Sequence, residues 1–347
     1  MERLDILSMD MEELNNYIVS IGEKKFRAAQ IYEWLHVKLA SSFSDMSNLS
    51  KNLREVLERD CIIRMPRILE MYESKIDGTR KYLFGLYDGC VIESVLMKYK
   101  HGNSVCISSQ VGCRMGCRFC ASTIDGLERN LTPSEMIGQI YMIQKDIGER
   151  VSNIVVMGSG EPFDNYDNLI RFIGLITSEK GLNISSRNIT VSTCGLVPNI
   201  IRFADEKLQV TLAISLHAPN DEKRREIMPV ANKYSIDEIL KACHYFYDKT
   251  KRRITFEYSL IEHVNDSKEE ALALAKLLQK LNCHVNLIPV NPIKERDYKH
   301  SKEEYIMKFK RILEDNKVNV TIRREMGADI NAACGQLRRS YIKEQKE

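Results

Sequence analysis

The sequence predicts an α/β protein built mainly around a parallel sheet, and three observations support this fold class. Helix-like segments fill about the first 60 residues, with apolar side chains three and four positions apart. Short β-rich segments with Asp-Gly pairs between them follow, up to about residue 100. From about residue 104 onward, strand-like and helix-like segments alternate, as in repeated right-handed βαβ crossovers. This alternation fits a complete or partial TIM-like barrel or an open doubly wound sheet.

The first two regions are expected to be accessory to the third. A helical module over residues 1–65 contains three amphipathic segments, EELNNYIVSIG, KKFRAAQIYEWLH and LSKNLREVLERD. Residues 66–100 are expected to form a three-stranded meander of RILEMYES, KYLFGLY and VIESVLMKY. Asp77-Gly78 and Asp88-Gly89 are the hairpin signals between these strands.

The main region, residues 101–347, is expected to hold the functional site. Its strand-like segments are VCISS, NIVVMG, NITVST, VTLAISLH, RITFEYSL and CHVNLIPV, with a final VNVTIR. Helices are expected near residues 133–147, 166–178, 196–206, 235–249, 267–281 and 302–315. In both candidate folds the site lies at the carboxyl ends of the strands. The unusual residues fall there, at Gly158–Pro162, Ser192–Gly195, Ser215–His217 and Asn291.

The composition is that of an ordinary globular protein. Of 347 residues, 44% are hydrophobic and 29% are charged, and the net charge is +3. These values exclude a mostly disordered chain, a collagen and a coiled-coil rod. No apolar run approaches the roughly 18 residues of a membrane span, and the first residues lack the pattern of a secretory signal. We therefore expect a cytoplasmic protein without a membrane partner.

Three of the ten cysteines lie close together in the sequence. Cys113, Cys117 and Cys120 have the spacing C-x3-C-x2-C and follow the first strand of the alternating region. Cytosolic cysteines grouped in this way more often bind metal or do chemistry than form disulfides. Three thiolates on a 4Fe-4S cluster would leave one iron for a ligand that is not protein. The alternatives are a structural zinc completed by Cys106, which needs four ligands, and a chance grouping.

Several motifs around these cysteines occur together in one known family. In chain order they are Cys106-Ile-Ser-Ser-Gln-Val-Gly-Cys-Arg-Met-Gly-Cys-Arg-Phe-Cys-Ala-Ser-Thr, Gly158-Ser-Gly-Glu-Pro-Phe-Asp-Asn, Ser215-Leu-His-Ala, Asn286-Leu-Ile-Pro-Val-Asn and Asp329-Ile-Asn-Ala-Ala-Cys-Gly-Gln-Leu. The cysteine spacing is the signature of radical S-adenosylmethionine (SAM) enzymes, and the whole set resembles the RlmN family over nearly the full chain. This resemblance implies a partial (β/α)6 TIM-like radical SAM barrel that carries the helical module and the meander.

The resemblance implies an RNA methyltransferase with one 4Fe-4S cluster and with SAM at the open iron of that cluster. The cluster ligands correspond to Cys113, Cys117 and Cys120. The positions that match SAM contacts in the family are Gly160, Glu161, Ser192, Ser215, Leu216, His217 and Asn291. Without the family pattern, a glycine turn after a strand is usually only a tight turn, and a lone histidine is more often a satisfied structural residue.

Three further residues match the chemistry that distinguishes the family. Cys334 corresponds to a cysteine that carries a methyl group as S-methylcysteine, and Cys106 to a resolving thiol that forms a transient disulfide with it. Glu93 corresponds to the proton acceptor. Taken alone, each cysteine would usually be a buried inert thiol and Glu93 a solvated strand residue. The remaining cysteines have no assigned role; they are Cys61, Cys90, Cys194, Cys243 and Cys283.

The resemblance also implies the substrates and partners. RlmN enzymes methylate carbon 2 of adenosine 2503 in 23S rRNA and of adenosine 37 in tRNAs, with two SAM per turnover. An electron donor such as flavodoxin or ferredoxin is implied, and a monomer is expected. The candidate RNA contacts are the N-terminal module and the basic run Lys249, Lys251, Arg252 and Arg253, although a solvated face is the simpler explanation of such a run.

Two other functions stay open at the level of sequence. The sister family Cfr shares the core and methylates carbon 8 of the same rRNA adenosine. Val290 and Arg324-Glu-Met-Gly are more similar to RlmN, whereas Met97-Lys-Tyr-Lys also occurs in Cfr. A zinc-stabilised RNA-binding protein without catalysis would explain the cysteines and the basic runs, but neither the strand-end motifs nor Cys334.

Overall fold

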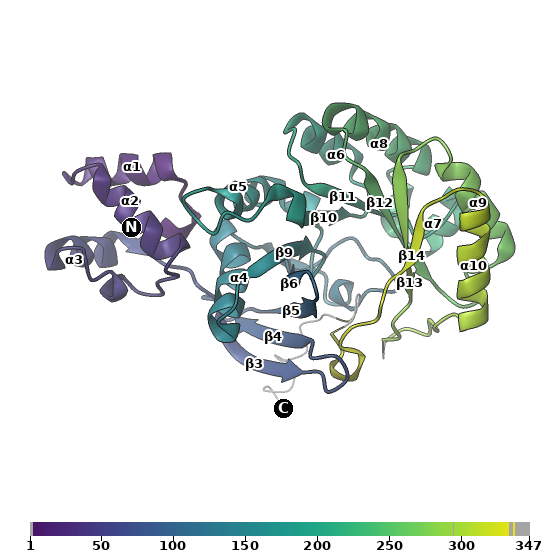
Figure 1. Ribbon diagram of the computed structural model, residues 1–347, viewed down its shortest axis with the longest axis horizontal. Coiled ribbons are helices and arrows are strands. Elements are labelled where there is room, and N and C mark those ends of the chain that lie inside the picture. Colours follow the sequence, from purple (N-terminus) through teal and green to yellow (C-terminus); the bar gives the residue numbers. More distant parts are fainter. Residues whose placement is uncertain (1–2, 294, 333–335, 337–347) are drawn as a thin grey trace.

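A helical module and a larger α/β body lie beside one another in the computed structural model, which describes residues 3–293, 295–332 and 336 (Figure 1). The module contains the three helices expected from the sequence. They are α1 (Met11–Ser20), α2 (Phe26–His36) and α3 (Lys51–Asp60), with 3-10 turns η1 (Ile6–Ser8) and η2 (Phe43–Asp45). The short strands β1 (Leu4–Asp5) and β2 (Cys61–Ile62) pair in parallel and bring the two ends of the module together.

Local sequence signals begin two of these helices. At α1, the carboxylate of Asp10 accepts from the backbone N–H of Glu13 at 2.9 Å, and Glu13 in turn accepts from the N–H of Asp10 at 3.1 Å. This reciprocal capping box satisfies N–H groups that a helix start leaves unpaired. At α3, the Ser50 hydroxyl accepts from the N–H of Leu53 at 3.2 Å. These caps explain why the helices begin where they do.

The body is organised on one ten-stranded sheet. Its order is β14-β13-β12-β11-β10-β9-β6-β5-β4-β3. Seven strands are parallel and follow one another in chain order: β6 (Gly102–Ile107), β9 (Val151–Val156), β10 (Ile189–Thr193), β11 (Thr211–Ser215), β12 (Ile254–Leu260), β13 (Cys283–Pro289) and β14 (Val320–Ile322). A doubly wound sheet would reverse its order at a switch point. The unbroken order therefore confirms the partial barrel over the doubly wound alternative.

The predicted meander is confirmed and is continuous with the barrel sheet. It consists of β3 (Arg67–Glu73), β4 (Arg80–Gly85) and β5 (Val91–Tyr99), joined antiparallel. β5 then pairs antiparallel with β6, so that Val95 lies opposite Cys106. The meander thereby brings its own side chains beside the first barrel strand.

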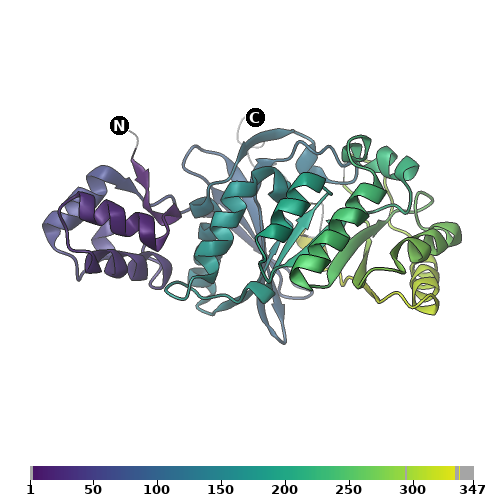
Figure 2. The same ribbon diagram turned by 90° about the horizontal axis from the view of Figure 1, so that it is seen from above.

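The barrel helices lie side by side over one face of the sheet (Figure 2). They are α4 (Pro133–Ile147), α5 (Tyr166–Thr177), α6 (Val197–Asp205), α8 (Ile236–Thr250), α9 (Lys268–Leu278) and α10 (Glu303–Asp315). The short helix α7 (Asp221–Ile227) follows β11 and packs against the 3-10 turn at Pro229–Asn232. α7 is not predicted from the sequence, because it is short and buries just Arg224 and Ile227. Within the described residues, no helix is long and apolar enough to cross a membrane.

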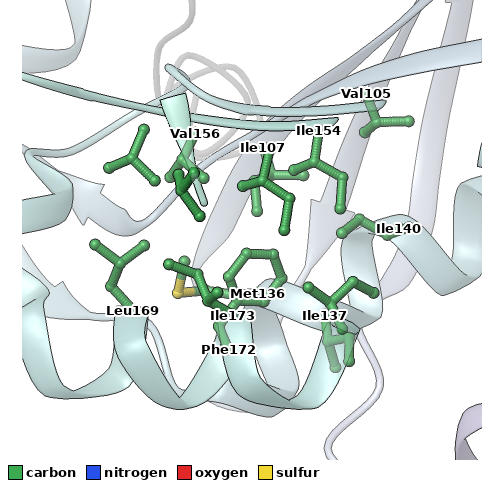
Figure 3. Close-up of a cluster of buried hydrophobic side chains, with 14 of the residues drawn as sticks. Val105, Ile107, Met136, Ile137, Ile140, Ile154, Val156, Leu169, Phe172 and Ile173 are labelled. Carbon is green, nitrogen blue, oxygen red and sulfur yellow. The ribbon is translucent and has the colours of Figure 1, made fainter. Parts of the chain in front are cut away.

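The core lies between the sheet and these helices. Figure 3 shows β6 and β9 packed on α4 and α5, and every labelled side chain in it is almost completely buried. Each such aliphatic or aromatic side chain contributes about 1.5–3 kcal/mol on transfer from water. The labelled residues are Val105, Ile107, Met136, Ile137, Ile140, Ile154, Val156, Leu169, Phe172 and Ile173. This packing fixes the carboxyl ends of the strands, where the cavity lies.

The helical module is docked on α4 and α5 by polar contacts. Asp5 accepts from the Ser134 hydroxyl at 2.5 Å, and Arg171 pairs with Glu13. His36 Nδ1 and the Tyr141 hydroxyl form a buried hydrogen bond of 2.8 Å. These contacts hold the module in one orientation relative to the barrel.

Three 3-10 turns complete the loops of the barrel, and a fourth lies near its C-terminal end. They are η4 (Pro162–Asn165), η5 (Ser186–Asn188), η6 (Pro229–Asn232) and η7 (Ala328–Ile330).

Candidate active site

A cavity opens at the carboxyl ends of the parallel strands, where the sequence predicts the site. Including the part open to solvent, it measures about 1220 Å³. Side chains from the cysteine loop, from the ends of β9 to β13 and from β5 and β6 line it. Of the residues predicted as site residues, those that line it are Cys106, Cys113, Cys117, Cys120, Gly160, Glu161, Ser192, Ser215, His217 and Asn291. The fold thus brings together residues that are far apart in the sequence.

The cysteine loop is held by a small hairpin of β7 (Gln110–Gly112) and β8 (Leu127–Asn130), with η3 (Ala121–Thr123) between them. Gly112 has φ +74°, and a Cβ there would lie 2.0 Å from the carbonyl oxygen of Gly126. No other residue fits this position. The N–H of Cys113 donates to the same Gly126 oxygen at 2.9 Å, and the Thr123 hydroxyl donates to the carbonyl of Cys120 at 2.9 Å. The loop backbone is therefore fixed before any metal binds.

The loop carries buried thiols of the kind that an iron–sulfur cluster would need. Cys113 and Cys117 are buried, and burial raises the pKa of Cys113 to about 12. Such thiols stay protonated at neutral pH unless a metal binds them. In the described part of the chain, no three His, Cys, Asp or Glu side chains converge on a point suited to one ion. Thiolates of a cluster bind separate irons, so they need not converge in that way.

The glycine turn after β9 is explained mainly by close packing of the chain. A Cβ on Gly158 would lie 2.7 Å from the carbonyl oxygen of Ile107, and one on Gly160 would lie 2.6 Å from Gln110 Cβ. Gly160 also has φ +106°, which L side chains rarely adopt. Both glycines therefore allow the turn to cross the segment after β6, and this places Glu161 in the cavity wall.

The carboxylate of Glu161 is buried and held on both sides. Oε1 accepts from the N–H of Phe163 at 3.0 Å, and Oε2 accepts from the N–H of Cys194 at 2.8 Å. Burial raises the pKa of Glu161, while these hydrogen bonds oppose that change. The side chains of Thr193 and Cys194 also hydrogen-bond this carboxylate, which lines the cavity. As an acceptor in the cavity wall, Glu161 suits an ammonium group, as the family pattern implies.

His217 is fixed as a neutral imidazole with one donor. Its Nδ1 accepts from the N–H of Ser259 at 2.8 Å, so the ring proton lies on Nε2. Burial lowers the pKa of His217 to about 3. Asn265 donates to the carbonyl oxygen of His217 at 2.7 Å and holds its left-handed backbone, with φ 57°. The edge-to-face contact with Phe119, at 4.8 Å between ring centroids, gives that aromatic of the cysteine loop a packing role.

The other predicted SAM contacts differ in what they present to the cavity. The hydroxyls of Ser192 and Ser215 lie 3.3 Å apart on the neighbouring strands β10 and β11. Asn291 follows β13 and lines the same wall. Leu216 is fully buried and does not line the cavity, and its N–H donates to the carbonyl of Glu257 at 3.1 Å. Its side chain belongs to the core.

Glu93 and Cys106 lie on the adjacent strands β5 and β6. Glu93 is 3% exposed, so the simple alternative of a solvated strand residue is wrong. Its Oε1 lies 3.5 Å from Lys81 Nζ. It shares a face of β5 with Val95 and Met97, both of which line the cavity. Cys106 is buried opposite Val95 and lines the cavity as well.

Cys334 lies outside the described residues. Ala332, two positions earlier, lines the cavity and packs with Cys106, Val95 and Met97. The other five cysteines are buried free thiols, of which only Cys194 lines this cavity. Cys90 donates to Glu128 at 3.2 Å, on the meander side.

Sequence reasoning missed Arg224, the largest fully buried side chain. Its guanidinium donates to the carbonyl oxygens of Leu216 at 3.1 Å, Cys194 at 2.6 Å and Ser215 at 3.3 Å. It thereby ties the ends of β10 and β11 together beneath the site. An arginine in the polar segment DEKRREI gives no signal of burial. Gln110 was also missed, and its Oε1 accepts from the N–H of Glu161 at 2.8 Å.

The predicted basic run lies at the other end of the barrel from the cavity. Arg252 donates to the hydroxyl of Thr211, the first residue of β11, at 2.9 Å. Lys249 pairs with Asp205, and Lys251 with Asp248. The amino ends of the strands face away from the site, so this position does not support the run as a contact near the target base.

Two family models match the chain. The N-terminal domain of ribosomal RNA large subunit methyltransferases, called RlmN_N, matches residues 4–63, and the radical SAM superfamily matches residues 107–275. A curated relative from Lachnoclostridium phytofermentans, named probable dual-specificity RNA methyltransferase RlmN, is 63% identical over 98% of this chain and 96% of its own length. The chain belongs to the RlmN family. A relative of the same name from Clostridium botulinum is 61% identical over 99% of this chain and 98% of its own length.

A solved structure agrees with this RlmN assignment. The crystal structure of a radical SAM methyltransferase from Sphaerobacter thermophilus covers 97% of this chain and 100% of its own length, with a TM-score of 0.94 and 42% identity. The protein is thus a radical SAM RNA methyltransferase of the RlmN type, and its superfamily implies a 4Fe-4S cluster and SAM. The alternative of a zinc-stabilised RNA-binding protein without catalysis is not supported.

Proposed function

We propose that this RlmN protein methylates carbon 2 of adenosine 2503 in 23S rRNA and of adenosine 37 in tRNAs, through S-methylcysteine at Cys334. The observation that carries the proposal is that Cys106, the cysteine loop and Ala332 all line one cavity. The resolving thiol, the cluster ligands and the chain leading to the methyl carrier would therefore meet at one place. Carbon 2 of adenine is electrophilic, so direct transfer of a methyl cation from SAM would fail there.

Cys113, Cys117 and Cys120 would hold the cluster. Gly160, Glu161, Ser192, Ser215, His217 and Asn291 would hold SAM, and Leu216 could contribute through its backbone alone. When bound, the cluster and SAM supply radical chemistry that can remove a hydrogen atom from a methyl group. The neutral His217 ring adds a hydrogen-bond donor without adding charge. Apolar side chains such as Val95 and Val156 in the cavity wall would limit the access of water to the reacting groups.

The protein residues would then act in turn. Cys334 takes a methyl group from one SAM, and after loss of a hydrogen atom the resulting carbon bonds to carbon 2 of the adenine. Glu93 would accept the proton that carbon 2 gives up, and the adduct would also give up one electron, for which the oxidised cluster would be the acceptor. The Cys106 thiolate attacks the Cys334 sulfur, so that the sulfur–carbon bond breaks, a disulfide forms and the released carbon takes up a proton. A reductant such as flavodoxin or ferredoxin must restore the cluster electron and the thiols.

Lys81 supports this arrangement of Glu93 and the C-terminal segment. Its Nζ lies 3.5 Å from Glu93 Oε1 and donates to the carbonyl oxygen of Asn331 at 3.4 Å. One cation thus links the proposed proton acceptor to the segment that precedes Cys334. The charge of Lys81 favours the ionised carboxylate, which is the form that accepts a proton.

A groove between the helical module and the meander suits the RNA. Arg3, Arg64 and Arg67 line it beside Tyr87, which is 74% exposed. Basic side chains would contact phosphates, and an exposed aromatic ring can stack on an unpaired base. Val91 of β5 lines this groove, and Val95 of the same strand lines the cavity. The target adenosine would have to leave its stack to enter. We further propose that the protein acts as a monomer in the cytoplasm.

Mass spectrometry of nucleosides tests the site of methylation. RNA from a strain without this gene would be compared with RNA from the complemented strain, for 23S rRNA and tRNA separately. We expect 2-methyladenosine in both RNAs when the gene is present. Finding 8-methyladenosine instead would establish the Cfr-type reaction, and finding neither would refute the proposed substrates.

A further inference from the structure

Glu257 is a buried carboxylate in the cavity wall to which no role is assigned. It lies on β12 and is 5% exposed. Its Oε2 accepts from Asn286 Nδ2 at 2.9 Å. In the part of the chain that the structure describes, Oε1 has no hydrogen-bond partner, although the side chain lines the cavity. One acceptor oxygen therefore faces the space that a ligand would fill.

The charge state of Glu257 decides what this open oxygen can bind. Burial raises the pKa of Glu257, whereas Arg323 and the hydrogen bond from Asn286 oppose that change. Arg323 lines the cavity too and favours the ionised, acceptor-only form. The position is thus prepared for a ligand with hydroxyl or N–H donors.

The position of Glu257 indicates which part of a ligand it would meet. Glu161 and Asp164 are the carboxylates that act on Cys113, and Glu161 also acts on Cys117. Glu257 instead lies in register with Ser215 on β11 and with Asn286 on β13. It therefore belongs to the polar row that begins with the Ser192 and Ser215 hydroxyls. A ligand whose amino-acid end is held at the cysteine loop would extend its other end along this row.

We propose that Glu257 binds the 2′,3′-diol of the ribose of SAM and so selects an adenosyl ligand with both hydroxyls free. This rests on the proposed binding of SAM at the cysteine loop. A carboxylate accepts from ribose hydroxyls in the same way in dinucleotide-binding folds. The target nucleotide inside an RNA strand has no free vicinal diol, because its 3′ oxygen is esterified to phosphate. The ammonium of SAM would instead lie beside Glu161.

Binding measurements on the cluster-loaded protein test this role without any turnover. The affinity for S-adenosylhomocysteine and for its 2′-deoxy and 3′-deoxy analogues would be measured by calorimetry. We expect the wild-type protein to bind each deoxy analogue about 10-fold to 100-fold more weakly, as for loss of a hydrogen bond to a charged group. Glu257→Gln should bind S-adenosylhomocysteine more weakly by a similar factor. It should also bind the parent and the deoxy analogues with nearly equal affinity. Glu269→Gln, on the exposed face of α9, is the matched control and should behave as wild type.

Several outcomes separate this role from its alternatives. The proposal would be overturned if Glu257→Gln and wild type distinguished S-adenosylhomocysteine from its deoxy analogues equally well. It would also be overturned if wild type did not distinguish them at all. If Glu257→Gln does not fold, Glu257→Asp provides the second variant and should reduce discrimination with iron content unchanged. The variant could instead bind the adenosyl ligands as wild type does and differ only in its affinity for RNA that lacks the 2′ hydroxyl at the target nucleotide. That result would assign Glu257 to the RNA substrate and would also overturn the proposal. Failure of the wild type to bind any adenosyl ligand would refute the proposed cofactor site itself.

Discussion

The guanidinium of Arg224 donates to the carbonyl oxygen of Cys194 at 2.6 Å, beneath the wall that carries Ser192 and His217. Arg224 also donates to the carbonyls of Ser215 and Leu216, so it joins the ends of β10 and β11. Burial lowers the pKa of Arg224, but its ordinary value of 12.5 is high enough for the group to stay charged. The shape of the site therefore depends on a residue that does not line the cavity.

Replacing Arg224 with Met should lower the free energy of unfolding by about 3 kcal/mol or more, because several buried carbonyl oxygens lose their donors. Arg224→Lys should also have a lowered free energy of unfolding, since one ammonium cannot span these carbonyls. Denaturant unfolding of the cluster-free protein measures the effect. Arg225→Met, one residue along on the exposed side of α7, should be close to neutral. Similar losses for both variants would contradict this role of Arg224.

Replacing Cys113, Cys117 or Cys120 singly with Ala should abolish stable binding of the cluster, because two thiolates remain for a site that needs three. Iron content and visible absorbance after anaerobic reconstitution are the measurements. Cys194→Ala is the matched control, since Cys194 is buried in the same cavity wall but lies outside the loop. It should keep its iron. Full iron content in any of the three loop variants would exclude that cysteine as a ligand.

Cys334 should carry one added methyl group when the protein is purified from cells with an intact cluster. The proposed reaction uses the same cavity for both methyl transfers, so the protein with all three loop cysteines changed to Ala should lack this methyl group. Peptide mass spectrometry of the C-terminal segment reads it directly. Methylation at another cysteine with Cys334 unmodified would refute the proposed carrier.

Cys106→Ala should trap a covalent protein–RNA adduct through Cys334 and reduce released product by orders of magnitude. Radical addition does not need Cys106, whereas release needs a thiolate, and water is a poor substitute for that soft nucleophile. A gel shift of labelled RNA under denaturing conditions measures the adduct. The double variant Cys106→Ala/Cys334→Ala should form none, and Cys283→Ala, a buried cysteine at the start of β13, should behave as wild type. Loss of iron without an adduct in Cys106→Ala would show that Cys106 is a metal ligand.

His36 should make the protein less stable in acid. Burial lowers its pKa from the ordinary value of 6.5 to about 3. Between these values the unfolded chain binds a proton and the folded chain does not, so the free energy of unfolding falls as pH decreases from about 6.5 toward 3. At pH 5 the loss from this side chain is about 2 kcal/mol. Denaturant unfolding at pH 7 and pH 5 should show a smaller loss for His36→Gln than for wild type. His244→Gln, on an exposed face of α8, should keep the wild-type difference, and an unchanged difference for His36→Gln would contradict the assignment.

The sequence by itself determined the order of the elements and the family. Capping residues such as Asp10 and Ser50, the Asp-Gly hairpin signals and the alternation of strands and helices are local, so they could be read before any contact was known. The C-x3-C-x2-C spacing is local in the same sense. These signals also predicted a site at the carboxyl ends of the strands, where the structure has its cavity, because parallel strands present these ends on one side.

Only the tertiary structure decided which residues face the cavity and which support it. No local pattern predicts that Arg224 is buried, that Glu93 pairs with Lys81 or that Glu257 keeps one open acceptor, because each depends on how the strands and loops assemble. It also did not reveal that the basic run after α8 lies at the amino ends of the strands, away from the cavity. Periodicity reports burial of apolar faces, whereas the partner of a buried charge is set by how the strands assemble.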